Sequence, residues 1–304
     1  MKMLALIFLG TLTVLTGRAD DQPVSPSQRV VVIGDIHADI EVARRAFQLA
    51  GAIDEQDNWI GGGLVVVQMG DIIGRSYEDR EVLDFILELR QRAELGGGRV
   101  HVLIGNHEVF GARLELRWVA DEAYPAFADL PGIDVSDPRL VHLPEYQRAR
   151  GAALMPGGYY AKQLAEFPAV LKLGETIFVH GGVTPHWASY GIDRINEEVS
   201  RWLADQTGEP LSTLGMDPGN VDDSVMMSRH FSEDVDEGDC LMLSESLAML
   251  EAKRMVVAHS VQESITARCD EHVWAVDVGM SRYYGGELQV LEIIDDSVLS
   301  IKRN

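Results

Sequence analysis

The chain has 304 residues, of which 46% are hydrophobic, and this is enough for one large domain with a substantial core. Its formal net charge of −22 argues against binding to nucleic acid or anionic lipid, because such a surface repels both. The charge does not exclude a small anionic substrate, since bound metal ions can reverse the local field.

The N-terminus is predicted to be a secretory signal peptide that covers residues 1–19. Lys2 supplies a positive charge, and a mostly apolar run follows from residue 3 to residue 15. That run is short for a transmembrane helix, which needs about 20 residues, although Arg18 leaves a retained anchor as the alternative. Cleavage would take the net charge from −22 to −24 and release the protein, free of the membrane, into the periplasm or the medium.

Two cysteines, Cys240 and Cys269, are present, without a Cys-x-x-Cys pair. A thiolate zinc site is therefore not expected. If the protein is exported, the two residues should form one disulfide that ties a helical segment to a late strand. The alternative is a pair of buried free thiols.

Strands and helices are predicted to alternate over residues 30–110, in the order typical of a doubly wound sheet. Strand patterns cover 30–33, 64–69 and 99–104, and helical patterns cover 40–49 and 77–95.

Residues 111–176 lack strand alternation and are predicted to form a helical insertion beside the site. Residues 193–254 are again mostly helix and loop, and strands return at 273–277 and 288–293. One domain over residues 28–304, with inserted helices, is the simplest interpretation.

Five apolar strands each run into an Asp, Asn or His at their carboxyl ends. The residues at these ends are Asp35 with His37, Asp71, Asn106, His180 and His259. Open α/β sheets bind ligands outside the carboxyl ends of their strands, so we expect these side chains to share one rim. Oxygen and imidazole ligands without thiolate suit Mn, Fe or Zn. Six ligands are too many for one tetrahedral site but suit two ions that share a carboxylate.

The full set of motifs resembles that of the calcineurin-like metallophosphoesterases. The motifs are Gly34-Asp35-Ile36-His37, Gly70-Asp71, Gly105-Asn106-His107-Glu108, His180-Gly181-Gly182 and the strand-terminal His259. Within that family the chain is most similar to the phosphoprotein-phosphatase type and to the Shewanella-like protein phosphatases. The narrower likeness rests on residues 156–159, 167–170, 178–183, 277–281 and 284–286. The resemblance implies an α/β fold, with a β-sandwich flanked by helices and helical insertions near the site.

The resemblance also implies a role for each ligand position. Two divalent metal ions are expected, the first held by Asp35 and His37, the second by Asn106, His180 and His259, with Asp71 bridging them.

Metal-bound hydroxide would then be the nucleophile, and His107 would protonate the leaving oxygen. Arg75 and, less closely, Arg229 match the phosphate-binding arginines of the family. A guanidinium fork fits two phosphate oxygens better than an ammonium group does.

The chain departs from the family pattern at two positions. Ala38 replaces a glycine, which is tolerated if its φ is negative. Gly74 replaces an aspartate that would orient His107. Either Asp79 or Glu78 reaches His107 instead, or its ring is poorly held. In the second case aryl phosphates should be preferred over alkyl phosphates, and Gly74→Asp should raise the alkyl rate if the backbone tolerates a side chain.

These features predict a metal-dependent phosphatase that acts on phosphomonoesters. Phosphoprotein is the expected substrate, and phosphotyrosine is one candidate residue. Two alternatives stay open. One is a small-molecule phosphoesterase, such as a dinucleotide polyphosphate hydrolase. The other is a weakly active module that binds metal or phosphate.

Overall fold

The computed structural model describes residues 29–215, 223–295 and 297–303. The predicted signal peptide, residues 1–19, lies outside the described residues. Across the described ranges, none of the helices has both the length and the apolar character that a membrane span requires.

The first of two five-stranded sheets has the strand order β10-β9-β1-β2-β3. Its strands are β1 (Arg29–Ile33), β2 (Val65–Gln68), β3 (Arg99–Val102), β9 (Gln289–Ile294) and β10 (Ser297–Arg303). The β-branched runs of β1, β2 and β3 pair in parallel, with Val31 opposite Val66 and Val66 opposite Val100. Strand β9 pairs antiparallel with β1, and β10 pairs antiparallel with β9.

The second sheet has the order β4-β5-β6-β8-β7. Its strands are β4 (Val170–Leu173), β5 (Thr176–Val179), β6 (Arg254–Val257), β7 (Thr266–Arg268) and β8 (Val273–Ala275). Strands β5, β6 and β8 are parallel, whereas β4 and β7 pair antiparallel at the two edges. Strand β4 corrects the prediction for residues 111–176. Its short Val-Leu-Lys-Leu sequence carries little alternation, and the hairpin with β5 makes it a strand.

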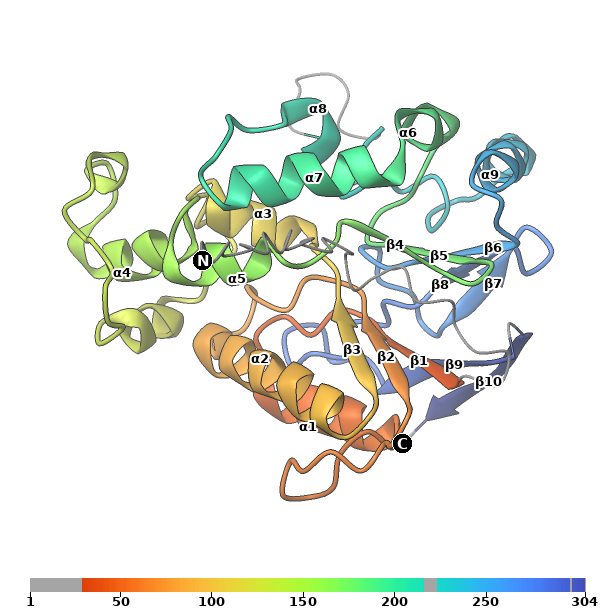
Figure 1. Cartoon of the computed structure of the whole chain (residues 1–304), viewed down its shortest axis with the longest axis horizontal. Helices are drawn as coiled ribbons and strands as arrows, with labels where there is room; N and C mark the ends of the chain where they lie inside the picture. The colour runs from red at the N-terminus through yellow and green to blue at the C-terminus, as the bar shows by residue number, and fades with distance from the viewer. Residues whose placement is uncertain (1–28, 216–222, 296, 304) are drawn as a thin grey trace, which may run out of the picture.

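Helices flank the two sheets on both sides (Figure 1). The longer α-helices are α1 (Ile40–Leu49), α2 (Asp79–Leu95), α4 (Glu145–Leu154), α7 (Ile192–Leu203) and α9 (Glu237–Met249). The shorter ones are α3 (Asn106–Ala112), α5 (Tyr159–Leu164), α6 (Pro185–Tyr190) and α8 (Leu211–Leu214), with 3₁₀ turns at η1 (Asp121–Phe127) and η2 (Pro138–Leu140). In Figure 1, α1 and α2 lie beneath the first sheet, and α6, α7 and α9 lie above the second.

One hydrophobic core extends across both sheets and the helices that cover them. Helix α1 joins it because Ala43, Ala46 and Phe47 recur at helical spacing and are fully buried. A smaller cluster around Leu140 and Leu143 supports the insertion. The predicted α/β sandwich with helical insertions is therefore confirmed.

A disulfide joins Cys240 in α9 to Cys269, which follows β7, with a Cα–Cα distance of 5.3 Å. This is the pairing predicted from the sequence. It connects the helical layer above the second sheet to an edge of that sheet.

Candidate metal centre

All six predicted ligand residues meet where the carboxyl ends of the two parallel strand sets approach each other. The first sheet supplies them after β1, β2 and β3, and the second after β5 and β6. The side chains are almost fully buried at five of the positions, namely Asp35, His37, Asp71, Asn106 and His180. Carbonyl and carboxylate oxygens thus converge with imidazole nitrogens in one place.

Three of these residues converge around the side-chain oxygen of Asn106. Its Oδ1 lies 2.9 Å from His180 Nε2 and 2.8 Å from His259 Nδ1. The other nitrogen of His180 donates to the Met69 carbonyl, which leaves Nε2 to face the site. The Nε2 atom of His259 is buried without a partner.

The remaining ligand residues gather around Asp71. The Nε2 atom of His37 lies 3.8 Å from both Asp71 Oδ2 and Asp35 Oδ2. The Oδ1 atom of Asp71 lies 3.4 Å from His180 Nε2, which joins this half to the half around Asn106. Oδ1 of Asp35 is buried and has no hydrogen-bond partner.

Burial makes the charged carboxylates of the centre electrostatically unfavourable, and a bound cation would offset this cost. Burial and the neighbouring carboxylates of Asp277 and Asp71 raise the pKa of Asp35 well above its ordinary value. Burial also opposes the charge on Asp71, but the imidazoles of His180 and His107 hold its pKa well below the ordinary value. Burial lowers the pKa of His37 to about 4. Metal ions bind imidazoles in the neutral form and carboxyl groups in the ionised form.

The donor set fits divalent metal ions. Two groups of potential ligand atoms each lie within 4.8 Å of one another, namely His37 with Asp71 and His107, and Asp35 with Asp71 and His180. Asp71 belongs to both groups, which is the position that a bridging carboxylate requires. The unpartnered buried atoms of Asp35 and His259 support the same interpretation.

Glu108 organises the backbone behind the centre. Its buried carboxylate accepts the amides of Asp71, Ile72 and Ile73, and also that of Gly105 at the start of its own helix α3. These contacts give Glu108 a supporting role behind the ligand residues. Burial raises the pKa of this carboxyl to about 7.

His107 lies beside the ligands, with Nε2 3.9 Å from Asp71 Oδ2 and its ring centroid 4.7 Å from that of His37. Burial lowers its pKa to about 3. Its other ring nitrogen faces Gly74, where an added Cβ would lie 2.2 Å from Nδ1. Gly74 also has a φ of +79°.

The condition set for the rescue by Gly74→Asp, a backbone that tolerates a side chain, is therefore not met, because the imidazole occupies the space that the new side chain would need. The two carboxylates considered as substitutes are engaged elsewhere. Asp79 accepts the amide of Gly74, and Glu78 accepts from Ile40 and Arg282.

Arg75 projects from the loop after β2 among aromatic side chains. Its guanidinium carbon lies 4.2 Å from the ring centroid of Trp118, 5.3 Å from that of Tyr283 and 5.7 Å from that of Tyr284. The Nε atom is buried without a hydrogen-bond partner. The positive charge contributes to the low pKa of His37 and of His107, which places it next to the centre.

Arg229 approaches from the side of the second sheet. It donates to Ser260 Oγ at 3.2 Å and forms an ion pair with Glu233. Its charge contributes to the lowered pKa of His259, for which burial is the main cause. The two arginines that the resemblance singled out thus both stand next to the ligand residues.

Two groups of residues near the site had no role in the sequence-based prediction. Trp118 and the tyrosines at 283 and 284 form the aromatic surroundings of Arg75, and Tyr284 lies 5.4 Å from His37 between ring centroids. Asp277 lies beside Asp35, and burial raises its pKa to about 6. Asp277 follows a strand, as the ligands do, so its position at a strand end could have identified it as a site residue. Tyr284 stood inside a motif used only for the resemblance, and Tyr283 precedes that motif.

The backbone at the centre adopts left-handed conformations at several non-glycine residues. The φ values are +51° at His37, +52° at Asp71 and +67° at His259. Ala38 has a φ of +54°, so the negative φ under which an alanine is readily tolerated there is not present. Its amide donates to the Ile72 carbonyl at 2.9 Å, and this bond between two loops holds the conformation.

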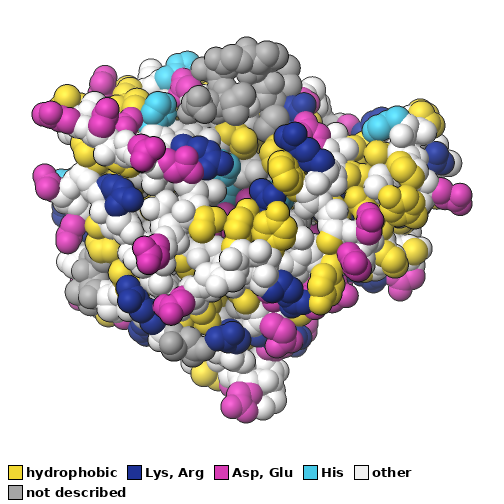
Figure 2. Space-filling view, turned by 180° about the vertical axis from the view of Figure 1, so that it is seen from behind, with side chains coloured by type: hydrophobic (Ala, Val, Ile, Leu, Met, Phe, Trp, Pro, Cys, Tyr) yellow, Lys and Arg dark blue, Asp and Glu magenta, His cyan; other side chains and the backbone are white. Residues whose placement is uncertain are grey.

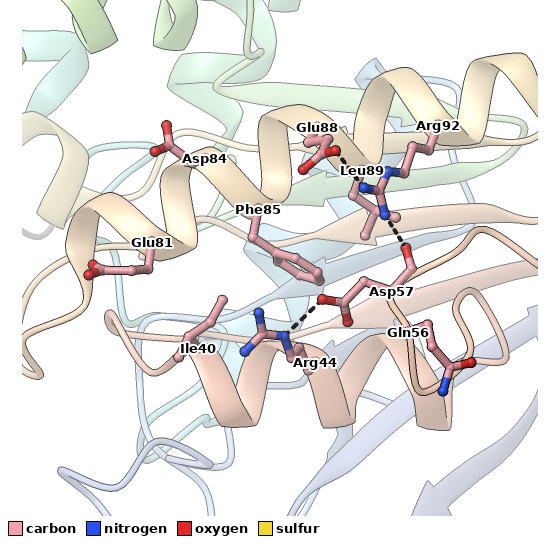
Figure 3. A pocket seen from close by; sticks show the side chains of 10 residues that line it. All are labelled: Ile40, Arg44, Gln56, Asp57, Glu81, Asp84, Phe85, Glu88, Leu89 and Arg92. Atoms are coloured by element: carbon pink, nitrogen blue, oxygen red, sulfur yellow. Dashed lines mark hydrogen bonds and ion pairs between the residues drawn. The ribbon is translucent and has the colours of Figure 1, made fainter. Parts of the chain in front are cut away.

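A surface pocket of about 420 Å³ lies elsewhere, between α1 and α2 (Figure 3). Arg44 pairs there with Asp57, and Arg92 pairs with Glu88. Its basic groups are thus neutralised by carboxylates of the pocket itself, and its lining residues include no histidine. We assign it no catalytic role.

On the reverse face of the molecule, Figure 2 shows a hollow where histidine and acidic side chains are visible between basic and hydrophobic ones.

The family model for calcineurin-like phosphoesterases matches residues 28–262. The chain belongs to the calcineurin-like phosphoesterase family. This phosphoesterase is 36% identical to Shewanella-like protein phosphatase 2 of Arabidopsis thaliana, over 90% of this chain and 77% of the relative. It is 28% identical to Shewanella-like protein phosphatase 1 of Plasmodium berghei, over 90% of this chain and 74% of the relative.

Among solved structures, the phosphoesterase is similar to the cold-active protein-tyrosine phosphatase of a psychrophilic Shewanella species. The TM-score is 0.65 at 24% identity, and the alignment covers 91% of this chain and 81% of that one. This likeness confirms the fold. The family match and the curated relatives identify the chain as a metal-dependent phosphatase of the Shewanella-like type.

Proposed function

We propose that this phosphatase uses two divalent metal ions to hydrolyse phosphomonoesters on proteins, with phosphotyrosine as the preferred residue. The observation that carries the proposal is the placement of Arg75 next to the ligand cluster and among three aromatic rings, those of Trp118, Tyr283 and Tyr284. No carboxylate among the described residues forms an ion pair with Arg75, and such a guanidinium suits phosphate oxygens, whereas aromatic side chains suit an aryl ring.

The residues of the site divide the work of hydrolysis. Metal ions bound to the six ligands supply Lewis acidity and activate water near neutral pH. Arg75 binds and orients the phosphate through its fork. His107 holds the proton that the leaving oxygen needs. Burial disfavours that proton in the free site, and the negative charge of a bound phosphate dianion counteracts this effect.

A groove beside the centre supports a polypeptide substrate. It has a volume of about 660 Å³ and is lined by Val261 and Gln262, two and three residues after His259, and by Tyr284. Tyr284 lines this groove and also belongs to the aromatic surroundings of Arg75, so the groove and the proposed phosphate site share one wall residue. A small substrate would leave it empty.

The relatives' names support the same substrate class. Both curated relatives are named protein phosphatases, and the similar solved structure is that of a protein-tyrosine phosphatase. We further propose that the protein is periplasmic or secreted. The Cys240–Cys269 disulfide supports an oxidising compartment.

A dinucleotide polyphosphate is the second candidate, because Trp118 and Tyr283 could also stack on a nucleobase. The deciding experiment measures kcat/KM for matched phosphotyrosine and phosphoserine peptides and for a dinucleotide polyphosphate, each with added Mn²⁺. We expect the phosphotyrosine peptide to be the best substrate. Faster turnover of the dinucleotide would refute the proposal, and absence of turnover of all three would favour a binding module.

A further inference from the structure

Six consecutive amides after β2 each have a defined acceptor. Those of residues 71–73 donate to Glu108, as described above. The amide of Gly74 donates to Asp79 Oδ1 at 2.7 Å, that of Arg75 to the Trp118 carbonyl at 2.7 Å, and that of Ser76 to the His37 carbonyl at 3.2 Å. This segment, residues 71–76, is called the 71–76 loop below.

The acceptor for Gly74 is itself held from the insertion. Asp79, the first residue of α2, accepts Arg150 Nε from α4 on its other oxygen at 2.6 Å. The two side chains are 0% and 1% exposed, respectively. The Nη1 atom of Arg150 is buried without a partner. A buried guanidinium from a helix of the insertion thus fixes the carboxylate that holds the 71–76 loop.

The positions of two functional side chains, those of His107 and Arg75, depend on the position of Gly74. The imidazole of His107 packs against it so closely that a Cβ would lie 2.2 Å from Nδ1. Arg75 is the next residue, and both residues have positive φ, +79° and +67°. At Arg75, which is not a glycine, such a conformation is kept only by its surroundings.

Stability alone is a poor explanation for the ion pair. Replacing a buried pair by apolar residues of similar volume is often neutral or stabilising, because desolvation offsets the attraction. An apolar pair, however, has no acceptor for the amide of Gly74. What Asp79 adds beyond packing is therefore the position of this amide.

We propose that the Asp79–Arg150 ion pair is a positioning device through which the insertion fixes the 71–76 loop. The pair determines the position of Arg75 relative to a bound phosphate and the orientation of the His107 ring. Neither member of the pair touches the ligand cluster through a described hydrogen bond or ion pair. The proposal rests on the proposed function for the roles of Arg75 and His107, but the placement of the loop can be measured without turnover.

The test compares two double variants of the full chain. In Asp79→Asn/Arg150→Gln the pair becomes neutral, but the side-chain oxygen at position 79 still accepts the amide of Gly74. In Asp79→Leu/Arg150→Met that acceptor is replaced by an apolar side chain of nearly the same size. The two variants differ mainly in one hydrogen bond to the loop.

Three measurements are made on each variant: hydrogen exchange of residues 74–76, binding of inorganic phosphate, and kcat and KM with a phosphotyrosine peptide. We expect the Leu/Met variant to melt at or above the temperature of the Asn/Gln variant. It should nevertheless exchange these amides faster and bind phosphate more weakly. Its kcat should fall by about 10-fold to 100-fold, the size expected for a small misplacement. The Asn/Gln variant should stay within about 3-fold of the natural protein.

Native exchange, phosphate binding and kcat in the Leu/Met variant would overturn the proposal. Equal losses in both variants that follow their melting temperatures would assign the pair to stability alone, and would also overturn it. If the natural protein hydrolyses none of the substrates, the proposed function fails, whereas amide exchange and phosphate binding still decide the positioning role.

Discussion

The Nδ1–H group of His180 donates to the main-chain carbonyl of Met69 over 2.8 Å. Met69 precedes Gly70 and Asp71, so this bond joins the end of β5 to the loop after β2. It fixes the imidazole tautomer and turns Nε2 toward Asn106 and Asp71. The bond therefore fixes the position of His180, from the second sheet, relative to Asp71, the carboxylate proposed to bridge the metal ions.

Asp71→Asn should remove phosphatase activity and lower the metal content of the purified protein. An amide offers one oxygen ligand without charge, where a bridging carboxylate offers two with charge. The fold should persist, as circular dichroism can show. Asp193→Asn, at an exposed position in α7, is the control. A variant that keeps two metal ions per chain and full turnover would contradict the bridging role.

Arg75→Lys should weaken inhibition by phosphate and lower kcat/KM. The bidentate fork is lost, and an ammonium group stacks less well on Trp118. Inhibition constants for inorganic phosphate measure the effect directly. Arg201→Lys on the exposed face of α7 serves as the matched control. Unchanged phosphate inhibition would remove Arg75 from the site.

Gly74→Ala should lower kcat about 10-fold or more while metal content stays the same. The new Cβ would lie 2.2 Å from His107 Nδ1, so the ring must move. The control is Gly132→Ala, because Gly132 has a similar φ of +76° and open space around its Cβ position. Both variants strain the backbone, but only the first displaces His107. Equal kinetic losses in the two would refute this explanation.

The Cys240→Ser/Cys269→Ser variant should lose stability, because the disulfide closes a loop of about 30 residues. The entropic model gives a contribution of about 3–4 kcal/mol. Urea unfolding of the variant and of the natural protein measures the difference. Mass spectrometry of the non-reduced natural protein should detect no free thiol. Two free thiols in that sample would contradict the bond.

Glu292→Gln should lower the melting temperature at pH 7 and have little effect near pH 2. Burial opposes the charge of Glu292, but hydrogen bonds from Arg29, Ser300 and Lys302 lower its pKa to about 2. A folded-state pKa below the unfolded value stabilises the protein at a pH above about 4.5. This contribution disappears as the pH falls toward 2. A melting-temperature difference that is independent of pH would contradict the assignment.

The strands that lead into the site could be predicted from local sequence. Residues 30–33 and 177–179 are β-branched or aromatic runs that end abruptly at glycine or histidine, and the structure places strands there. Parallel pairing then brings their carboxyl ends to one edge. Strand β4 was not predicted because its partner, β5, decides its conformation.

The supporting contacts of the site could not be predicted, because they join residues far apart in the chain. Arg150 meets Asp79 across 71 positions, and Trp118, inside the insertion, meets Arg75 across 43 positions. The positive φ of Ala38 likewise results from a hydrogen bond to another loop. Such contacts follow from packing, which local sequence patterns do not encode.

The proposed ligands extend from Asp35 to His259, and they come from both sheets. The full set of proposed ligands is complete only when β6, which precedes His259, lies beside β5. Metal ions would then bind only a chain that is already nearly folded, and their binding would stabilise the contact between the two halves of the sandwich. The identity of the ions would be set by whatever divalent cations surround the chain at the place and moment of its folding.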